Sequence, residues 1–359
     1  GGLRRRLLSA LTGPKYRSLA VLPVANLSGD PAEEYYADGM TYTLIAHVSK
    51  IGALRVISRD SVMGYKGAKK PLPEIARDLK VDTILETSVA REGGRVHFTA
   101  QLMEAAAQRN LWSETYDRSA TDVLRLQSEV AREIARQINV RVSPEQERRL
   151  TGAREVNPKV YEAYVRGKFY VSQNTPEGFE KGMQYMHQAV EIDPADPLGY
   201  IGLAEGYITM GHGGAEDADV YPRARAAAEQ ALKLDPNAAE AVGILAEVAL
   251  YLEWDWAKAE KLFQRALELN PSHAMTHYQY AWYLALFNRL DEAIVEHKLA
   301  RDYDPLRALN TGWLGWLYYA AGRYDEAIAE ARKGLDLDPK FWPSSVSYTH
   351  LRAHETGRN

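Results

Sequence analysis

Five short blocks that end in Asp-Pro or Asn-Pro recur along the second half of this 359-residue chain at a nearly constant interval. The prolines that close them lie 42, 35, 34 and 34 residues apart, at Pro194, Pro236, Pro271, Pro305 and Pro339. Self-similarity at a period of this size is typical of architectures in which small units stack on one another. The second half is therefore predicted to form a linear array of units.

Two amphipathic helices fill each period. In the unit that ends at Pro305, the first helix is marked by Tyr280 and Leu284 and the second by Ala293 and Ala300. The second helix is expected to end before the proline, whose ring clashes with the preceding turn and lacks an N–H. The spacing resembles the tetratricopeptide repeat (TPR). This resemblance implies five stacked helical pairs that coil into a superhelix with a concave groove.

Two units depart from this pattern. The unit that ends at Pro271 has Trp254-Asp255-Trp256 where a glycine usually precedes the second helix. The unit that ends at Pro236 carries eight extra residues, which we place between its two helices, from Gly211 to Tyr221.

Aromatic residues occupy first-helix positions that the TPR resemblance places on the concave groove. The candidate protein-binding residues are Tyr251, Tyr278, Trp282, Trp316 and Tyr319, together with Glu247. Large aromatic side chains suit the binding of an extended peptide or a partner helix. The alternative is that they pack between helices as ordinary core. The Lys and Arg residues with which some TPR proteins hold peptide carboxylates are absent from the assigned positions.

The first half shows a mixed α/β pattern. Strands are predicted at residues 19–25 and 54–57, and helices at 30–50, 58–65 and 71–79. Residues 81–90, 96–102 and 111–116 are predicted to form three further strands, the first two joined by a Gly93-Gly94 hairpin turn.

Two helices of this half carry an apolar stripe. Met40, Leu44 and Val48 mark the helix at 30–50, and Leu126, Val130, Ile134 and Ile138 mark a helix at 122–142 that would cover the sheet. Ser143 and Gln146 form a capping-box pattern for a further helix. The predicted fold class is an α/β (or α+β) domain with a small mixed sheet, followed by an all-α TPR superhelix.

Whole phrases of the first half resemble the TolB amino-terminal-domain-like module of bacterial proteins. The matching stretches are Leu19-Ala-Val-Leu-Pro23, Asn26-Leu-Ser-Gly-Asp30, Tyr36-Ala-Asp-Gly39, Leu54-Arg-Val-Ile-Ser-Arg59, Leu72-Pro-Glu-Ile-Ala76, Gln101-Leu102 and Gln127-Ser-Glu-Val-Ala131. This resemblance supplies no catalytic residues. It implies a TPR array behind the module and, upstream in a longer protein, a winged-helix DNA-binding domain, a nucleotide cyclase or a protein kinase.

Composition excludes several classes of site. The absence of cysteine rules out disulfides, thiolate zinc sites and cysteine nucleophiles. The longest apolar stretches are shorter than the roughly 20 residues of a membrane-spanning helix. We predict no cofactor, no metal and no nucleic-acid binding by this segment. The module could work in the cytoplasm or on the periplasmic side of a membrane-anchored parent, tethered through a region upstream.

Four local patterns resemble phosphate-binding, hydrolase, metal-binding or acid–base motifs, and each has a simpler structural explanation. Gly64-Tyr-Lys-Gly-Ala-Lys-Lys70 lacks the spacing of a phosphate-binding loop, and Gly211-His-Gly-Gly214 lacks the Gly-x-Ser-x-Gly partner of a hydrolase. His273 and His277 lie four residues apart without an evident third metal ligand. Glu33, Glu34 and Asp38 lie at a predicted helix start, where carboxylates favour the helix dipole.

We divide the chain into a basic leader at 1–17, the TolB-like domain at 18–142, a helix and hinge at 143–158, the TPR array at 159–343 and a non-native tail at 344–359. The leader holds Arg4, Arg5 and Arg6. The tail resembles a translated sequencing adaptor, so its histidines His350 and His354 are given no role. The last repeat lacks a polar capping helix, which predicts an exposed apolar face and self-association.

The favoured function is non-catalytic: a protein-interaction scaffold in a larger bacterial signalling or transcription-regulatory protein, with the TPR groove binding a peptide or helix. The alternative is a small-ligand sensor, in which the α/β domain binds a molecule such as a nucleotide at its strand ends and the repeats serve for dimerisation. A hydrolase is a third hypothesis.

Overall fold

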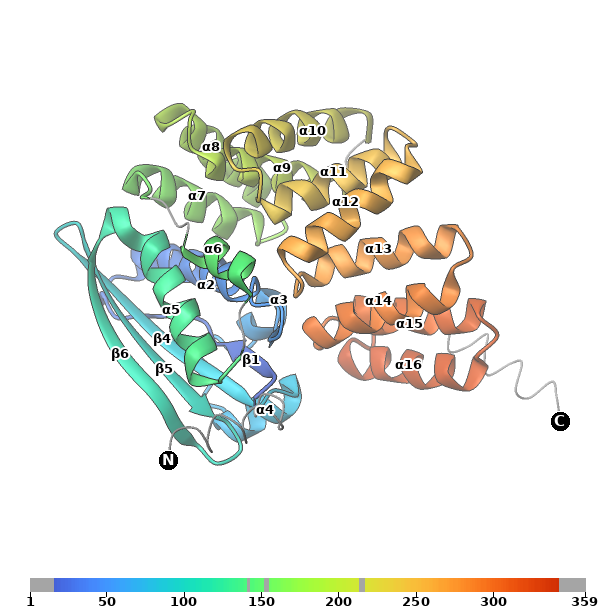
Figure 1. Cartoon of the computed structure of the whole chain (residues 1–359), viewed down its shortest axis with the longest axis horizontal. Coiled ribbons are helices and arrows are strands. Elements are labelled where there is room, and N and C mark those ends of the chain that lie inside the picture. The colour runs from blue at the N-terminus through green and yellow to red at the C-terminus, as the bar shows by residue number, and fades with distance from the viewer. Residues whose placement is uncertain (1–15, 141–142, 152–154, 213–216, 342–359) are drawn as a thin grey trace.

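The computed structural model describes residues 16–140, 143–151, 155–212 and 217–341, which form an α/β domain and a helical array (Figure 1). The predicted leader and tail lie outside the described residues, apart from Tyr16 and Arg17. The elements before the array are β1 (Ser18–Val21), β2 (Ala25–Asn26), α2 (Glu34–Val48), β3 (Arg55–Val56), α3 (Arg59–Met63), α4 (Leu72–Leu79), β4 (Thr83–Glu92), β5 (Arg95–Glu104), β6 (Arg109–Ser119), α5 (Val123–Gln137) and α6 (Pro144–Thr151).

The sheet is mixed, as predicted. Its strand order is β3-β1-β4-β5-β6, with β2 also paired to β4. The strand β1 runs parallel to β3 and β4, whereas β4, β5 and β6 are antiparallel. The predicted hairpin turn is present between β4 and β5: Gly93 and Gly94 have φ values of 54° and 80°, a conformation that glycine adopts without strain.

The apolar stripes of α5 and α2 are both buried, and α5 packs on the sheet as predicted. Leu126, Val130 and Ile134 of α5 are fully buried, as are Met40, Leu44 and Val48 of α2. The helix α2 is buried on its other side as well, where Tyr35, Tyr36 and Ile45 are less than 9% exposed. This second buried side packs against the array. The capping box that precedes α6 is also present, because the Ser143 and Gln146 side chains each accept the other's backbone N–H.

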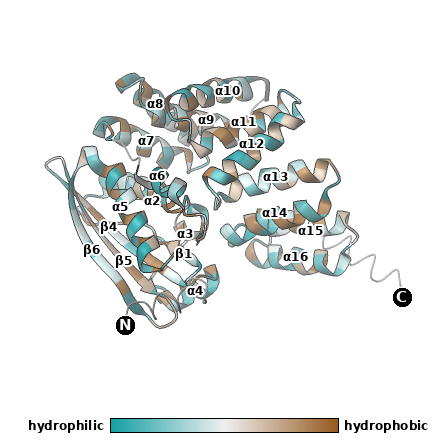
Figure 2. Ribbon diagram, viewed as in Figure 1, coloured by the Kyte–Doolittle hydropathy of each residue, from teal (hydrophilic) through white to brown (hydrophobic). Residues whose placement is uncertain are grey.

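The array contains five helical pairs within the described residues, which confirms the predicted repeats. The pairs are α7 (Pro158–Val171) with α8 (Pro176–Ile192), α9 (Pro197–His212) with α10 (Asp217–Leu234), α11 (Ala239–Tyr251) with α12 (Trp256–Leu269), α13 (Ala274–Leu286) with α14 (Leu290–Tyr303), and α15 (Ala308–Ala320) with α16 (Tyr324–Leu337). Hydrophobic residues lie mainly on helix sides that face neighbouring elements, and hydrophilic residues on the outer sides (Figure 2).

The second and third units, which depart from the repeat pattern in sequence, accommodate these departures in their helices and in a turn. The insertion of the second unit mostly lengthens its helices: α9 and α10 have 16 and 18 residues, against 13 and 14 in α11 and α12. Part of the Gly211–Gly214 motif lies outside the described residues. In the third unit Trp254 adopts a φ of 56°, the left-handed conformation that Gly322 adopts at the same turn of the fifth unit. A tryptophan therefore occupies the position where the fifth unit has a glycine, and the turn keeps the same left-handed conformation.

The array curves around the α/β domain, so that α7–α10 lie above it and α13–α16 lie beside it in Figure 1. A single hydrophobic cluster runs from the sheet through α2 into α7, α9 and α11. The concave groove that was expected to bind another polypeptide is therefore partly filled by the chain's own α/β domain. The part of that groove near the start of the array is occupied by α2, because the second apolar side of α2 needs burial.

Candidate functional site

A cavity of about 670 Å³ lies between the α/β domain and the concave side of the array. The domain contributes residues of α2 and α3 such as Asp38 and Tyr42, and the array contributes residues of α7, α9, α11 and α13 such as Lys168 and Glu240. Asp60, Ser172 and Asn174 line it and are exposed, so the cavity opens to solvent on that side. Its volume falls in the range of small-molecule sites.

Close packing of α2 against α7 forms one end of the cavity. A Cβ atom on Gly39 would lie 2.2 Å from Cβ of Val165, so only glycine permits this approach. Beside it, Gln127 Nε2 donates hydrogen bonds to Thr43 Oγ1 at 2.6 Å and to Tyr161 Oη at 3.1 Å. These buried polar groups join α5, α2 and α7 into one unit.

The loop between α14 and α15 contacts the domain at the other end. Asp304 Oδ1 accepts hydrogen bonds from the hydroxyls of Ser58 and Ser61, each at 2.6 Å. Burial raises the pKa of the Asp304 carboxyl, which these two hydrogen bonds partly offset. Nearby, Ser272 Oγ donates to Leu54 O and accepts from the N–H of Val56. The array therefore holds the domain at two separated places, with the cavity between them.

The wall at α9 carries a paired carboxylate. Glu205 accepts a hydrogen bond from Tyr42 Oη at 2.6 Å and from Lys168 Nζ at 2.8 Å. Burial, followed by the negative charge of Glu205, raises the pKa of Tyr42 well above its usual range. Tyr42 is therefore a neutral hydrogen-bond donor at physiological pH, and Lys168 is neutralised by Glu205.

Glu247 is the one predicted site residue that lines the cavity. It is 5% exposed, and its Oε2 atom lies 3.0 Å from His212 Nε2 and accepts a hydrogen bond from Gln279 Nε2 at 3.2 Å. Tyr251 lies next to this group, because its hydroxyl donates to Gln279 Oε1 at 3.2 Å. A buried carboxylate held in this way organises the contact between α9, α11 and α13.

The remaining predicted residues lie further along α13 and α15. Trp282 and Trp316 pack against each other with ring centroids 5.3 Å apart, and Trp282 Nε1 donates to Tyr278 Oη at 2.9 Å. These three side chains are half-buried. Tyr319 is 41% exposed and packs on Tyr324. The structure thus brings Tyr278, Trp282 and Trp316 together and places Tyr319 at the end of α15.

Sequence reasoning missed two contributors to this region. Trp313 packs on Trp282 with ring centroids 4.9 Å apart, and Leu286, one turn after Trp282, is 63% exposed. The three-residue spacing of Trp313 and Trp316 on one helix could have indicated the first of them. Leu286 is the last residue of α13, and nothing in the neighbouring sequence signals its exposure.

His273, His277 and the acidic residues at the start of α2 have partners within the chain. His277 Nδ1 lies 2.6 Å from Glu296 and its Nε2 lies 2.9 Å from Pro271 O, while His273 Nδ1 lies 2.6 Å from Thr276 Oγ1. The carboxylates Glu34 and Asp38 both pair with Lys66. Among the described residues, no group of three or more metal-ligand side chains is found, and no helix is long and apolar enough to cross a membrane.

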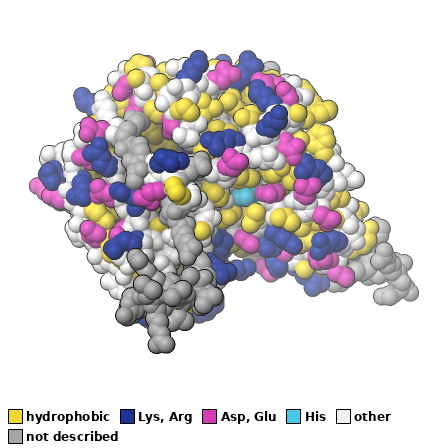
Figure 3. Space-filling view, viewed as in Figure 1, with side chains coloured by type: hydrophobic (Ala, Val, Ile, Leu, Met, Phe, Trp, Pro, Cys, Tyr) yellow, Lys and Arg dark blue, Asp and Glu magenta, His cyan; other side chains and the backbone are white. Residues whose placement is uncertain are grey.

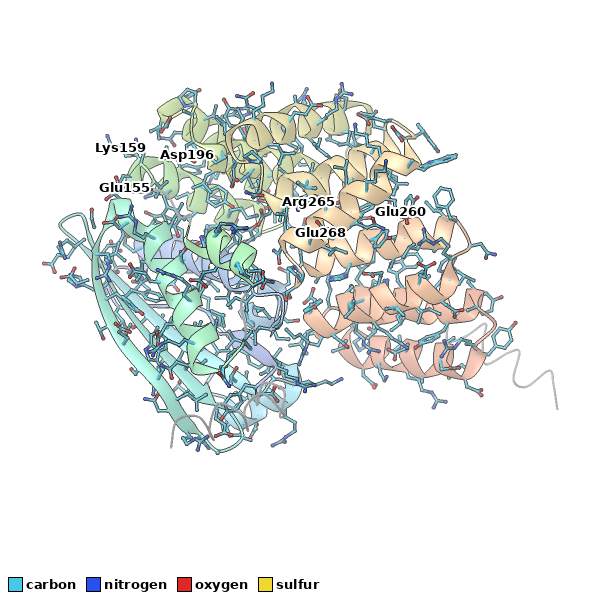
Figure 4. All side chains as sticks on the ribbon, in the orientation of Figure 1. Glu155, Lys159, Asp196, Glu260, Arg265 and Glu268 are labelled. Carbon is cyan, nitrogen blue, oxygen red and sulfur yellow. The ribbon has the colours of Figure 1, made fainter. Side chains whose placement is uncertain are left out.

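Basic and acidic side chains are interspersed on the face of the molecule shown in Figure 3. The outer side of α12 gives an example, since Arg265 and Glu268 form an ion pair at 3.0 Å (Figure 4). Continuous basic surfaces bind nucleic acid, and this face does not show one.

Two segments match models of the tetratricopeptide repeat, residues 262–295 and residues 312–341. The first spans the end of α12, the whole of α13 and part of α14, and the second spans most of α15 and all of α16. Tetratricopeptide repeats are thus present in the helical C-terminal region, and repeats of this kind form scaffolds for protein interaction. The TolB-like resemblance of residues 18–142 stays a prediction.

The chain is similar to a Rhizobium meliloti (strain 1021) protein named "Putative adenylate cyclase 3", with 31% identity over 284 residues that cover 78% of this chain and 42% of that protein. It is also similar to the transcriptional regulator HilA of Salmonella typhimurium, with 30% identity over 146 residues that cover 40% of this chain and 26% of that protein. The chain spans less than half the length of these curated relatives.

Solved TPR structures also resemble the chain. TTC0263, a thermophilic TPR protein of Thermus thermophilus, matches 53% of this chain and 99% of its own, with 21% identity and a TM-score of 0.43. YrrB, described as a TPR protein with an unusual peptide-binding site, matches 54% of this chain and 91% of its own, with 21% identity and a TM-score of 0.38.

Proposed function

We propose that this chain is the non-catalytic interaction segment of a larger regulatory protein, and that it binds a peptide or helix of a protein partner. The proposed binding surface is the distal groove, which we define as Tyr251, Trp282, Leu286, Trp316 and Tyr319. The TPR matches support an interaction scaffold, and the names of the two relatives, a cyclase and a transcriptional regulator, support a regulatory setting.

The observation that carries this proposal is the exposure of large apolar side chains at the ends of three successive first helices. Tyr251, Leu286 and Tyr319 are 38%, 63% and 41% exposed, at or near the last residues of α11, α13 and α15. They flank the Trp282–Trp316 pair, whose rings supply a rigid apolar surface. Exposed apolar residues that cluster around aromatic anchors are typical of protein-binding sites.

The α/β domain leaves this surface uncovered. On α11 the cavity lining extends from Glu240 to Glu247, one turn before Tyr251, whereas on α13 it ends at Thr276 and at α15 it reaches only Arg307, the residue before the helix. None of the five residues of the distal groove lines the cavity. A partner can therefore bind there while the domain stays in place, so binding need not displace α2.

The full chain should select peptides from a random display library, and a selected peptide can be titrated by fluorescence polarisation. The double change Leu286→Glu and Tyr319→Glu places two carboxylates on the groove without removing buried side chains. We expect it to weaken binding by about tenfold or more, because two charges then border the apolar surface of the Trp282–Trp316 pair and oppose its burial by a peptide.

The matched control is Leu27→Glu, which changes a leucine that is 65% exposed on the α/β domain. Selected peptides that bind the double variant and the wild type equally would refute the distal groove as the binding surface. Self-association through the last repeat also stays a prediction, which sedimentation of the same preparations will check.

A further inference from the structure

The two edges of the sheet differ in what covers them. At β3 the array lies against the edge, where Ser272 Oγ accepts a hydrogen bond from the N–H of Val56 and Tyr303 O accepts one from the N–H of Ser58. At the other edge, β6 pairs only with β5 and lies at the left margin of Figure 1. Among the described residues, no backbone hydrogen bond joins β6 to a third segment. The outer side of this 11-residue strand is therefore open to pairing.

Side-chain exposure also marks β6 as an open edge. Ser113, Glu114 and Thr115 are consecutive exposed residues, although successive side chains of a strand point to opposite faces of the sheet. Beside the strand lies a cavity of about 640 Å³, lined by Glu114, Tyr116 and Arg118 of β6 and by charged side chains of α5. A further strand on this edge would therefore find room for its side chains.

The geometry of β6 limits how a second copy of the strand can pair with it. A bulge near Leu111 interrupts β6, and the strand is regular from Trp112 to Ser119. The middle of this stretch lies between Thr115 and Tyr116. Two copies that run antiparallel around a two-fold axis thus form their longest regular ladder when the axis passes at one of these two residues.

Charge selects between the two positions of the axis. With the axis at Tyr116, Glu114 of each copy lies opposite Arg118 of the other, so symmetry gives two pairs of opposite charges. With the axis at Thr115, Glu114 lies opposite Tyr116 and no such pair forms. An axis at Glu114 or at Asp117 would place two like carboxylates opposite each other. Opposite charges directly across a strand pair stabilise it and like charges destabilise it, which favours the axis at Tyr116.

Both members of this pair can reach across the edge. Within the described residues Glu114 accepts only from neutral donors, Trp112 Nε1 and Tyr116 Oη, each at 3.3 Å. Arg118 forms an ion pair with Glu129 through Nη2 at 2.9 Å. A guanidinium carries five N–H donors, so Arg118 can hold Glu129 and a second carboxylate at once.

We propose that this chain forms a two-fold dimer in which the β6 strands of two copies pair antiparallel with the axis at Tyr116, so that the two sheets become one. Each Glu114 then contacts Arg118 of the other copy. This surface is separate from the distal groove and from the last repeat, so the proposal does not rest on peptide binding or on self-association through that repeat.

Sedimentation velocity of the full chain over a range of concentrations should show a reversible dimer. Glu114→Arg and Arg118→Glu each place like charges opposite each other twice, and we expect either change to weaken dimerisation by about tenfold or more. The double variant restores opposite charges in the reversed sense and should dimerise again. Residues four apart on one strand are about 13 Å apart, so this rescue requires a contact between two copies.

The matched control for the charge change is Glu180→Arg, at an exposed position of α8, which should dimerise as the wild type does. Circular dichroism should show that all four variants are folded. The proposal is overturned if the wild type stays monomeric throughout the concentration range, or if the two single variants associate as strongly as the wild type. A double variant that stays as weak as the single variants would also overturn it, because the Glu114–Arg118 contact would then be absent.

Discussion

His297 of α14 shows how burial sets the chemistry of a single residue. It is 2% exposed, packs on Tyr278, and its Nε2 atom donates to Asn310 O at 2.9 Å. Burial lowers its pKa from 6.5 to about 4. The unfolded chain therefore binds a proton below pH 6.5 that the folded chain does not bind until about pH 4, so stability falls as the pH falls through this window.

The expected slope from His297 is about 1.4 kcal/mol per pH unit between those limits. His297→Gln keeps a donor for Asn310 O and removes the titration. Urea unfolding at several pH values should show a shallower loss of stability in this variant than in the wild type. Parallel stability curves for the two proteins would contradict the assignment.

At the scale of elements, the contact between α2 and α7 depends on the absence of a side chain at Gly39. Gly39→Ala would place its Cβ 2.2 Å from Cβ of Val165 and force the helices apart. We expect a loss of about 1–3 kcal/mol, typical of overpacking. Urea unfolding measures it, and adding Val165→Ala should restore part of the loss.

The control is Gly64→Ala at the end of α3, where the nearest atom to a new Cβ is 3.7 Å away and φ is −61°. It should change stability by no more than about 0.5 kcal/mol. If Gly39→Ala behaves like this control, the two helices are not packed as closely as described.

At the scale of the whole molecule, the array and the domain are joined near both ends of the array. Asp304→Ala removes the acceptor of the Ser58 and Ser61 hydroxyls and should release the α14–α15 loop while α2 stays packed on α7. Hydrogen exchange should increase around residues 58–61 and 303–307, with a stability loss of about 1–3 kcal/mol.

Asp193→Ala serves as the matched control for the docking contact. Asp193 closes the first repeat, and its side chain accepts only from the nearby N–H of Ala195 in the hydrogen bonds described. This variant should leave exchange at 58–61 and 303–307 unchanged. Equal exchange in both variants would show that Asp304 does not dock the array on the domain.

Local patterns were sufficient to predict most elements. Residues within a few positions of one another produce the stripe on α5 and the Gly93-Gly94 turn, and the repeats show as a regular spacing of prolines. These features can therefore be recognised in the sequence without knowledge of the tertiary structure. The cavity could not be predicted in this way. Thr43 contacts Tyr161 over 118 positions of sequence, and no periodicity indicates which surfaces pack together at that distance.

Two sequence features pointed to buried positions without identifying what surrounds them. Tyr35, Tyr36 and Ile45 make α2 apolar on both sides, which is typical of a helix buried all round, yet this does not identify the covering element. Asn270 resembles the aspartates that close other repeats, and only its surroundings reveal that its oxygen lacks a partner.

The amino-acid sequence alone determined the paired helices, their number and the mixed sheet, because spacing and side-chain type act through local geometry, whereas the assignment of aromatic residues to a binding groove stays a prediction. Tertiary structure alone decided that the array closes around its own α/β domain and that Glu240 and Asn270 share a cavity with Tyr42. Burial of the second apolar side of α2 accounts for this arrangement, since apolar surface is covered by whichever element fits its shape.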